Sequence, residues 1–186
     1  MLPLIFARPI TGWDYVVAKV GAIWAVVFAF GFIPHVVLYV GNVFVSDRAL
    51  GYMGDHLDVL WKVPISVGLL SLYYSVLALA MASLTSKRLV AAASFLILLL
   101  VSSVVAGVLI TSGGANTGED VHSAWVALNL LGVPLLVRDL VFLGHAARDT
   151  PMYGIDGGGL IAIGMYLLVV LTSIGVLLRR YRWAQA

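Results

Sequence analysis

Long stretches without a charged side chain dominate this sequence and limit what it can fold into. They cover Val20–Ser46, Val63–Ser86, Leu89–Thr111 and Leu160–Leu178. Each is about as long as the roughly 20 residues that an α-helix needs to cross the hydrocarbon core of a bilayer. The sequence therefore predicts an all-α fold, a polytopic membrane bundle with four transmembrane helices.

The composition excludes an ordinary soluble domain. Hydrophobic residues make up 62% of the chain and charged residues 11%, whereas soluble domains are roughly 45–50% apolar and about 25% charged. The net charge of +2 is too small to indicate nucleic acid as a partner. The absence of cysteine leaves no disulfide, thiolate nucleophile or Cys-ligated metal. The lipid bilayer is the surrounding that this composition fits.

A further apolar segment, residues 121–143, is too short for a span. Its apolar run Ala124–Val137 contains Pro134 and stops at Arg138-Asp139. Runs of this length are more often re-entrant or interfacial than spanning. We expect a re-entrant or interfacial hairpin before the last span, returning to water at Arg138 and Asp139. Because adjacent residues on a helix do not face each other, no ion pair between these two is expected.

The placement of basic residues predicts the orientation. With both termini and the Lys87-Arg88 turn inside, the basic residues that remain outside are Arg48, Lys62, Arg138 and Arg148, so seven of the 11 lie inside. This bias agrees with the positive-inside rule. We expect one membrane domain over residues 1–186, a multi-pass protein of the cytoplasmic membrane with both termini cytoplasmic.

Small residues recur at helical spacing in two of the predicted spans. The second span carries Ser71, Ser75, Ala78 and Ala82 on one face, and the third offers Ser103 and Gly107. Small side chains let membrane helices approach closely. Plain helix packing explains this pattern, and a sliding face along a transport route is the functional alternative.

His35 is the only ionisable side chain well inside a predicted span. Such residues are functional candidates by default, although a neutral histidine beside Pro34 can instead hydrogen-bond a carbonyl freed by a proline kink. In the loop between the first two spans, Asp55-His56-x-Asp58 has metal-ligand residue types. We expect those three side chains to be solvated and assign no metal to the chain.

Several catalytic and nucleotide-binding patterns are absent. The sequence has no G-x-x-x-x-G-K-[ST] phosphate loop, no H-E-x-x-H and no G-x-S-x-G. The chain is therefore not expected to bind ATP in that way, to be an enzyme or to carry a cofactor of its own. A small intramembrane enzyme using His35 or the Asp55–Asp58 loop is the least favoured alternative, and a non-transporting membrane scaffold or accessory protein is the second.

The polar segment Ala7–Lys19, ahead of the first span, reads Ala-Arg-Pro-Ile-Thr-Gly-Trp-Asp-Tyr-Val-Val-Ala-Lys. Pro9 and Gly12 interrupt any continuous helix, Asp14 suits the start of the next helix, and Trp13 and Tyr15 suit a membrane–water boundary. This segment resembles the cytoplasmic stretch before the third span of permease subunits in ABC-2 class transporters. The matching positions are Ala7, Arg8, Pro9, Ile10, Thr11, Asp14, Tyr15 and Lys19, while Ala18 stands where glycine is common.

The resemblance implies a coupling role for residues 1–19, which would dock on a separate ATP-binding subunit. Arg8 and Asp14 would contact that subunit, Trp13 and Tyr15 would anchor the segment at the interface, and Lys19 would face cytoplasmic headgroups. The implied protein is a transmembrane permease subunit of an ABC exporter, paired with a second permease subunit as a homo- or heterodimer, with ATP bound by the partner. Because that family usually has six spans, two of them before this segment, the chain resembles the C-terminal two-thirds of such a permease.

Overall fold

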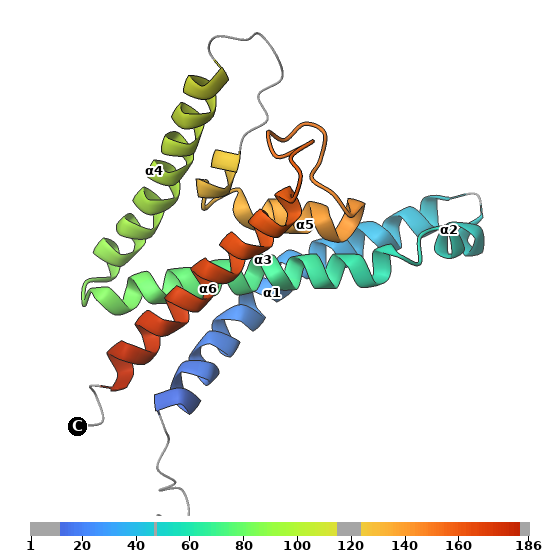
Figure 1. The fold of residues 1–186 in the computed structure, drawn as a ribbon. Helices are drawn as coiled ribbons and strands as arrows, with labels where there is room; N and C mark the ends of the chain where they lie inside the picture. The colour runs from blue at the N-terminus through green and yellow to red at the C-terminus, as the bar shows by residue number, and fades with distance from the viewer. Residues whose placement is uncertain (1–11, 47, 115–123, 183–186) are drawn as a thin grey trace, which may run out of the picture.

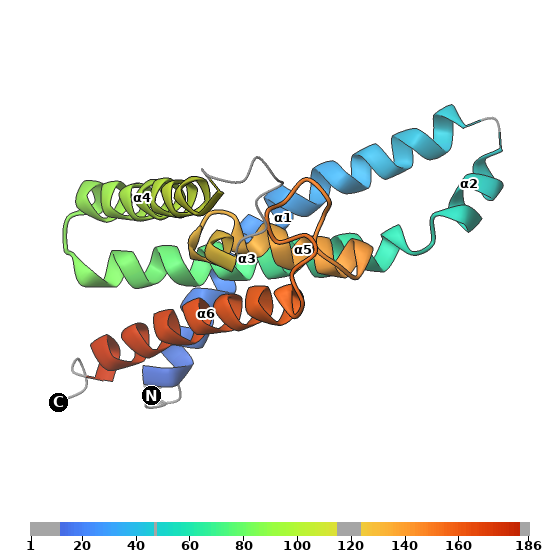
Figure 2. The ribbon, with the colours of Figure 1, turned by 45° about the horizontal axis from the view of Figure 1, so that its top comes forward.

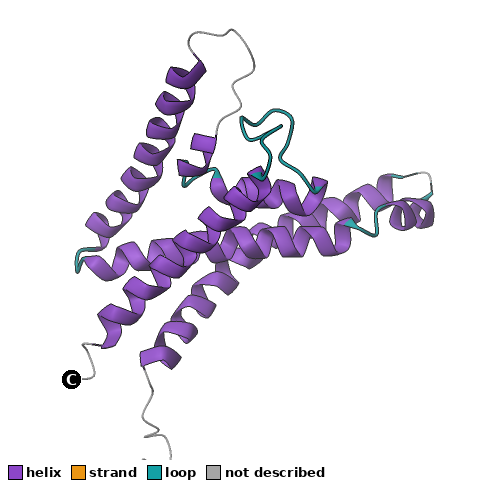
Figure 3. Cartoon of the chain, viewed as in Figure 1, coloured by secondary structure: helices purple, strands orange, loops and turns teal. Residues whose placement is uncertain are grey.

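The computed structural model describes residues 12–46, 48–114 and 124–182. In chain order its elements are α1 (Gly12–Val45), α2 (Ala49–Asp55), α3 (Val59–Leu84), α4 (Arg88–Gly114), the 3₁₀ helix η2 (Ala124–Leu128), α5 (Val133–Leu143) and α6 (Gly158–Arg182) (Figure 1). Within these ranges every regular element is a helix and no strand occurs (Figure 3). The predicted all-α fold is confirmed.

Four of the described helices, α1, α3, α4 and α6, are long and apolar enough to cross a membrane. The chain is a multi-pass membrane protein with a helical bundle. Each helix begins before its predicted span, most of all α1, which begins at Gly12 rather than Val20. Trp13, Asp14, Tyr15 and Lys19 belong to the first two turns of this continuous helix, with Asp14 near its start as the sequence predicted.

Helix α3 is the centre of the bundle. It packs against α1, α4, α5 and α6, and 44% of its most apolar stretch is buried, against 6% for α1 and 11% for α4. The largest buried cluster joins α3, α4, α5 and α6 and consists of Tyr73, Leu77, Leu99, Val133, Val137, Tyr166, Val169 and Val170. The apolar faces that α1 and α4 leave exposed fit lipid or a second subunit.

The first turns of α1, the end of α6 and the turn between α3 and α4 lie at the same end of the bundle (Figure 2). A second buried cluster joins α1, α3 and α6 there, formed by Val16, Val76, Leu79, Ala80 and Leu177. At the opposite end, α2 connects α1 to α3 (Figure 1).

The segment predicted as a short hairpin forms η2 and α5, and its residues 121–123 lie outside the described ranges. Helix α5 packs against α3 and α6 and buries Val133, Pro134, Leu136 and Val137. It ends at Gly144, which adopts a left-handed conformation (φ 75°) and donates its N–H to the carbonyl of Leu140 over 3.0 Å. Glycine has no Cβ to oppose that backbone conformation.

The stripe of small residues is only partly buried within the chain. Ser71 and Ser75 are buried, but Ala78 is half-buried and Ala82 is exposed. Gly107 is also exposed, and a Cβ there would meet no other group within 4 Å. Among the described residues, no neighbouring helix encloses Ala82 or approaches Gly107, and a packing role for these two positions stays a prediction.

Close helix approach occurs instead between α1 and α3. A Cβ added to Gly31 would lie 3.0 Å from Cγ1 of Val67, so a larger residue there would require the Val67 side chain to shift. About two turns before Gly31, the indole Nε1 of Trp24 donates a hydrogen bond to the carbonyl of Gly68 over 3.0 Å. α1 and α3 therefore meet through the close contact at Gly31 and the hydrogen bond from Trp24 to Gly68.

Candidate functional site

The predicted coupling residues are divided between described and undescribed parts of the chain. Arg8 and Pro9 lie outside the described residues. Trp13, Asp14 and Tyr15 lie in the first turn of α1, and all three are exposed. Asp14 is placed where a carboxylate complements the positive end of the helix dipole.

Lys19 is half-buried and contacts the end of α6, and its predicted position at the cytoplasmic headgroups stays a prediction. Its ammonium donates a hydrogen bond to the hydroxyl of Tyr181 over 2.9 Å. It also lies 5.5 Å from the ring centroid of Tyr15 and 5.3 Å from that of Tyr181, within the range of cation–π attraction. The two rings meet edge to face with centroids 4.9 Å apart.

These three side chains form a contact between the beginning of α1 and the end of α6, which we call the α1–α6 clamp (Tyr15, Lys19 and Tyr181). Next to the clamp, Val16 is buried against Leu177 and Val76, and Tyr181 packs on the same cluster. The first turns of α1 are therefore joined to α6 and α3 by packed side chains.

Removing the polar part of the clamp should weaken this end of the bundle. We expect Tyr181→Phe, which deletes the hydroxyl that accepts from Lys19, to lower the free energy of unfolding by about 1 kcal/mol. Thermal unfolding in detergent, read by size-exclusion fluorescence, measures this. Tyr153→Phe, in the loop before α6, is the matched control. Equal midpoints for the parent chain and Tyr181→Phe would show that the hydrogen bond adds nothing.

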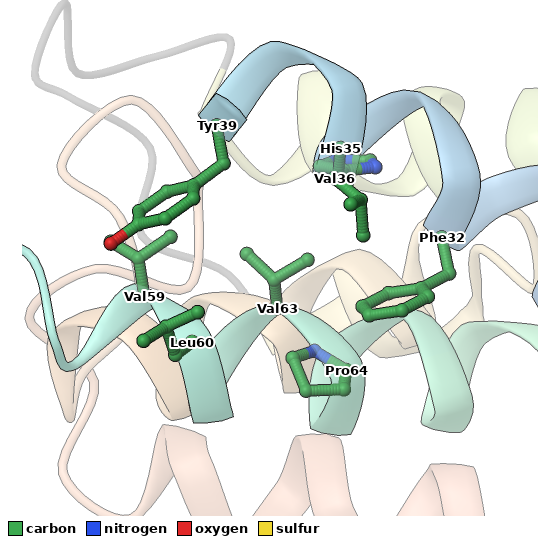
Figure 4. Close-up of a pocket in the computed structure, with 8 residues that line it drawn as sticks. All are labelled: Phe32, His35, Val36, Tyr39, Val59, Leu60, Val63 and Pro64. Atoms are coloured by element: carbon green, nitrogen blue, oxygen red, sulfur yellow. The ribbon is translucent and has the colours of Figure 1, made fainter. Parts of the chain in front are cut away.

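The His35 ring bonds a backbone carbonyl of its own helix, but this carbonyl belongs to Gly31 and is not the one that Pro34 leaves without a donor, which is that of Phe30. Nδ1 of His35 lies 2.7 Å from the carbonyl oxygen of Gly31, four residues earlier on α1, which continues through Pro34. A carbonyl only accepts, so Nδ1 carries the hydrogen and Nε2 of the neutral ring remains an acceptor. The ring lies at a small cleft of about 80 Å³ between α1 and the start of α3, with Phe32, Tyr39 and Pro64 among its lining residues (Figure 4).

The loop residues Asp55, His56 and Asp58 do not converge. Nδ1 of His56 lies 2.9 Å from the carbonyl of Tyr52, and its ring stacks on that tyrosine. Asp58 accepts a 2.9 Å hydrogen bond from Lys62, one turn into α3, and this bond lowers the pKa of the Asp58 carboxyl. Among the described residues, no three His, Asp or Glu side chains are grouped as metal ligands would be.

Arg138 and Asp139 form the ion pair that the sequence reasoning rejected. Nη2 and Nε of Arg138 donate to Oδ1 of Asp139 over 2.7 and 3.0 Å. The Asp139 side chain is 9% exposed and that of Arg138 is 47% exposed. The objection that adjacent residues point apart fails here because the long arginine side chain bends back over its neighbour. A low-dielectric site also favours such a contact, since an unpaired buried carboxylate would be costly.

This ion pair lies on the wall of a cavity of about 570 Å³, which we call the α1–α3–α5 cavity. His35 of α1 and Ser66 of α3 supply its other polar groups, and apolar side chains of α3 and α5 supply the rest. The volume falls in the range of small-molecule sites. One sequence signal could have revealed it, because a charged pair ending an apolar membrane segment is a functional candidate wherever the segment is buried.

Comparison with known proteins does not assign the chain to a family. No protein-family model matches the chain, and neither curated proteins nor solved structures give a significant match.

Proposed function

We propose that this chain is the membrane-spanning subunit of an ATP-driven exporter whose ATPase is a separate polypeptide. The observation that supports the proposal is the α1–α6 clamp, which joins Tyr15 and Lys19 of the segment that resembles an ABC-2 coupling region to Tyr181 of α6. The start of α1 exposes Trp13, Asp14 and Tyr15, while Val16 packs against α3 and α6. A helix start of this kind can receive force at the membrane surface and pass it to both helices. In this proposal both termini face the cytoplasm, and the membrane is the cytoplasmic one.

The proposed mechanism uses only rigid packing. Nucleotide binding would close the ATPase partner and push on the segment around Arg8 and Asp14. The first turn of α1 would pass the displacement through Val16 and the clamp to α3 and α6. Packed helices respond by switching between discrete arrangements, which suits access that alternates between the two membrane faces. A second permease subunit would cover part of the exposed surface of α1 and α4.

Charge changes in the coupling segment should weaken partner binding. We expect Arg8→Glu combined with Asp14→Ala to reduce by roughly fivefold the ATP hydrolysis that co-purifies with the tagged chain, equivalent to about 1 kcal/mol of binding free energy. The measurement is the nucleotidase activity retained after gentle detergent extraction, normalised to the chain. Arg48→Glu with Asp55→Ala, the same changes at the other end of α1 and in α2, should leave it unchanged.

Two results would contradict the proposal. One is full retention of co-purified ATP hydrolysis in the Arg8→Glu/Asp14→Ala variant. The other concerns sidedness, and the chain is suited to that test because it contains no cysteine. Labelling of a Trp13→Cys variant in intact cells by an impermeant maleimide would place residue 13 outside, where no cytoplasmic ATPase reaches it.

A further inference from the structure

The α1–α3–α5 cavity has a polar end and apolar walls. Arg138 and Asp139 form the polar end on α5, and Val63, Val67 and Leu70 of α3 line it together with Phe142. The polar group of Ser66 is already satisfied, because its hydroxyl donates to the carbonyl of Lys62 over 2.7 Å. The ion pair therefore provides the charge within the cavity.

The positive member of this ion pair is the accessible one. Asp139 is buried behind it, while nearly half of the Arg138 side chain is exposed. The guanidinium donates to Asp139 through Nε and Nη2, and both hydrogen bonds end on one carboxylate oxygen. Asp139 thus fixes the plane of the guanidinium and leaves Nη1 without a partner among the described residues. A fixed guanidinium edge is suited to a carboxylate or phosphate, which it can bind with two parallel hydrogen bonds.

The cavity lies between two helices that share a neighbour. Helices α1 and α5 both pack against α3 but make little contact with each other, so α3 forms the floor of a cleft between them. The nearby Lys62 is already engaged, with its ammonium bound to Asp58 over 2.9 Å and to the carbonyl of Phe142 over 3.2 Å. A hydrocarbon chain can lie along α3 while its head group meets Arg138.

We propose that the α1–α3–α5 cavity binds an amphiphile with an anionic head group, which Arg138 holds while the hydrocarbon tail packs on Val63, Val67 and Leu70. The head group is a phosphate, as in a phospholipid, or a carboxylate, as in a fatty acid. This inference does not depend on an ATPase partner, and it holds or fails independently of the exporter proposal.

Spin-labelled probes in phosphatidylcholine vesicles containing the full chain test the binding. The fraction of motionally restricted probe is compared for phosphatidylglycerol, stearate and phosphatidylcholine. We expect at least one anionic probe to associate roughly fivefold more strongly than phosphatidylcholine, equivalent to about 1 kcal/mol. A preference for phosphatidylglycerol or for stearate identifies the head group. No preference for either anionic probe would overturn the proposal.

Variants locate the binding. Arg138→Gln should abolish the preference, and Arg138→Lys should retain part of it, because the charge remains but the two-point geometry is lost. Arg48→Gln removes a charge outside the cavity and should change nothing. Loss of the preference in Arg48→Gln, or its retention in Arg138→Gln, would overturn the proposal.

A cavity-filling variant covers the case in which Arg138→Gln does not fold. Ala147→Trp places a large side chain at the cavity wall from the loop after α5, outside the helices that enclose the cavity. It should reduce the association of the anionic probe to that of phosphatidylcholine. Undiminished binding in a folded Ala147→Trp protein would place the site elsewhere.

Discussion

Replacing Tyr73 with alanine is expected to lower the free energy of unfolding by about 2–3 kcal/mol. Tyr73 is fully buried at the point where α3 meets α4, α5 and α6, and its ring lies 5.4 Å from those of Tyr74 and Tyr166. Transfer from water contributes little within a bilayer, so the loss comes from the cavity and the missing packing contacts. Thermal unfolding in detergent measures it.

The hydroxyl of Tyr73 should contribute nothing to this loss. It is buried and has no hydrogen-bond partner among the described residues, so Tyr73→Phe should leave stability unchanged or raise it. Tyr166→Phe is the matched control, because that hydroxyl donates to the carbonyl of Leu69 over 2.8 Å, and its removal should cost about 1 kcal/mol. Equal losses in both phenylalanine variants would show that Tyr73 has a polar partner.

The spans were predictable from sequence because hydropathy is a local property. An uncharged run of sufficient length forms a helix in lipid whatever its neighbours are, so all four long helices were found. Their ends were less predictable. Helix α1 begins at Gly12 because Trp13–Lys19, although polar, has no residue that stops a helix, and its turns gain contacts with α6 that the sequence does not display.

Contacts between distant residues could not be read from spacing. Lys19 and Tyr181 are 162 positions apart, and only the packing of α1 on α6 brings them together. For Arg138 and Asp139, a rule for exposed helices gave the wrong answer, because in a buried setting the arginine side chain bends to satisfy its neighbour. The cavity depends on α1 and α5 both packing on α3 while making little contact with each other, which no sequence pattern encodes.

The stripe of small residues on α3 also shows that spacing alone does not reveal which positions the neighbouring helices cover. Spacing of three and four places Ser71, Ser75, Ala78 and Ala82 on one face, but it does not say how far a neighbouring helix follows that face. Ser75 is 1% exposed, whereas Ala82 is exposed. The neighbouring helices therefore cover only part of the stripe.

Ser75→Leu is therefore expected to destabilise the bundle by about 1–3 kcal/mol, because the larger side chain must displace packed neighbours or shift the backbone of α3. Ala82→Leu inserts a comparable side chain on the same face and should change the unfolding midpoint little, since no described residue encloses that position. Ser75→Ala separates size from polarity: the Ser75 hydroxyl has no partner among the described residues, so its removal should be neutral. A destabilised Ala82→Leu variant would show that another subunit covers this end of α3, and a stable Ser75→Leu variant would mean that the helices around α3 pack more loosely than the structure shows.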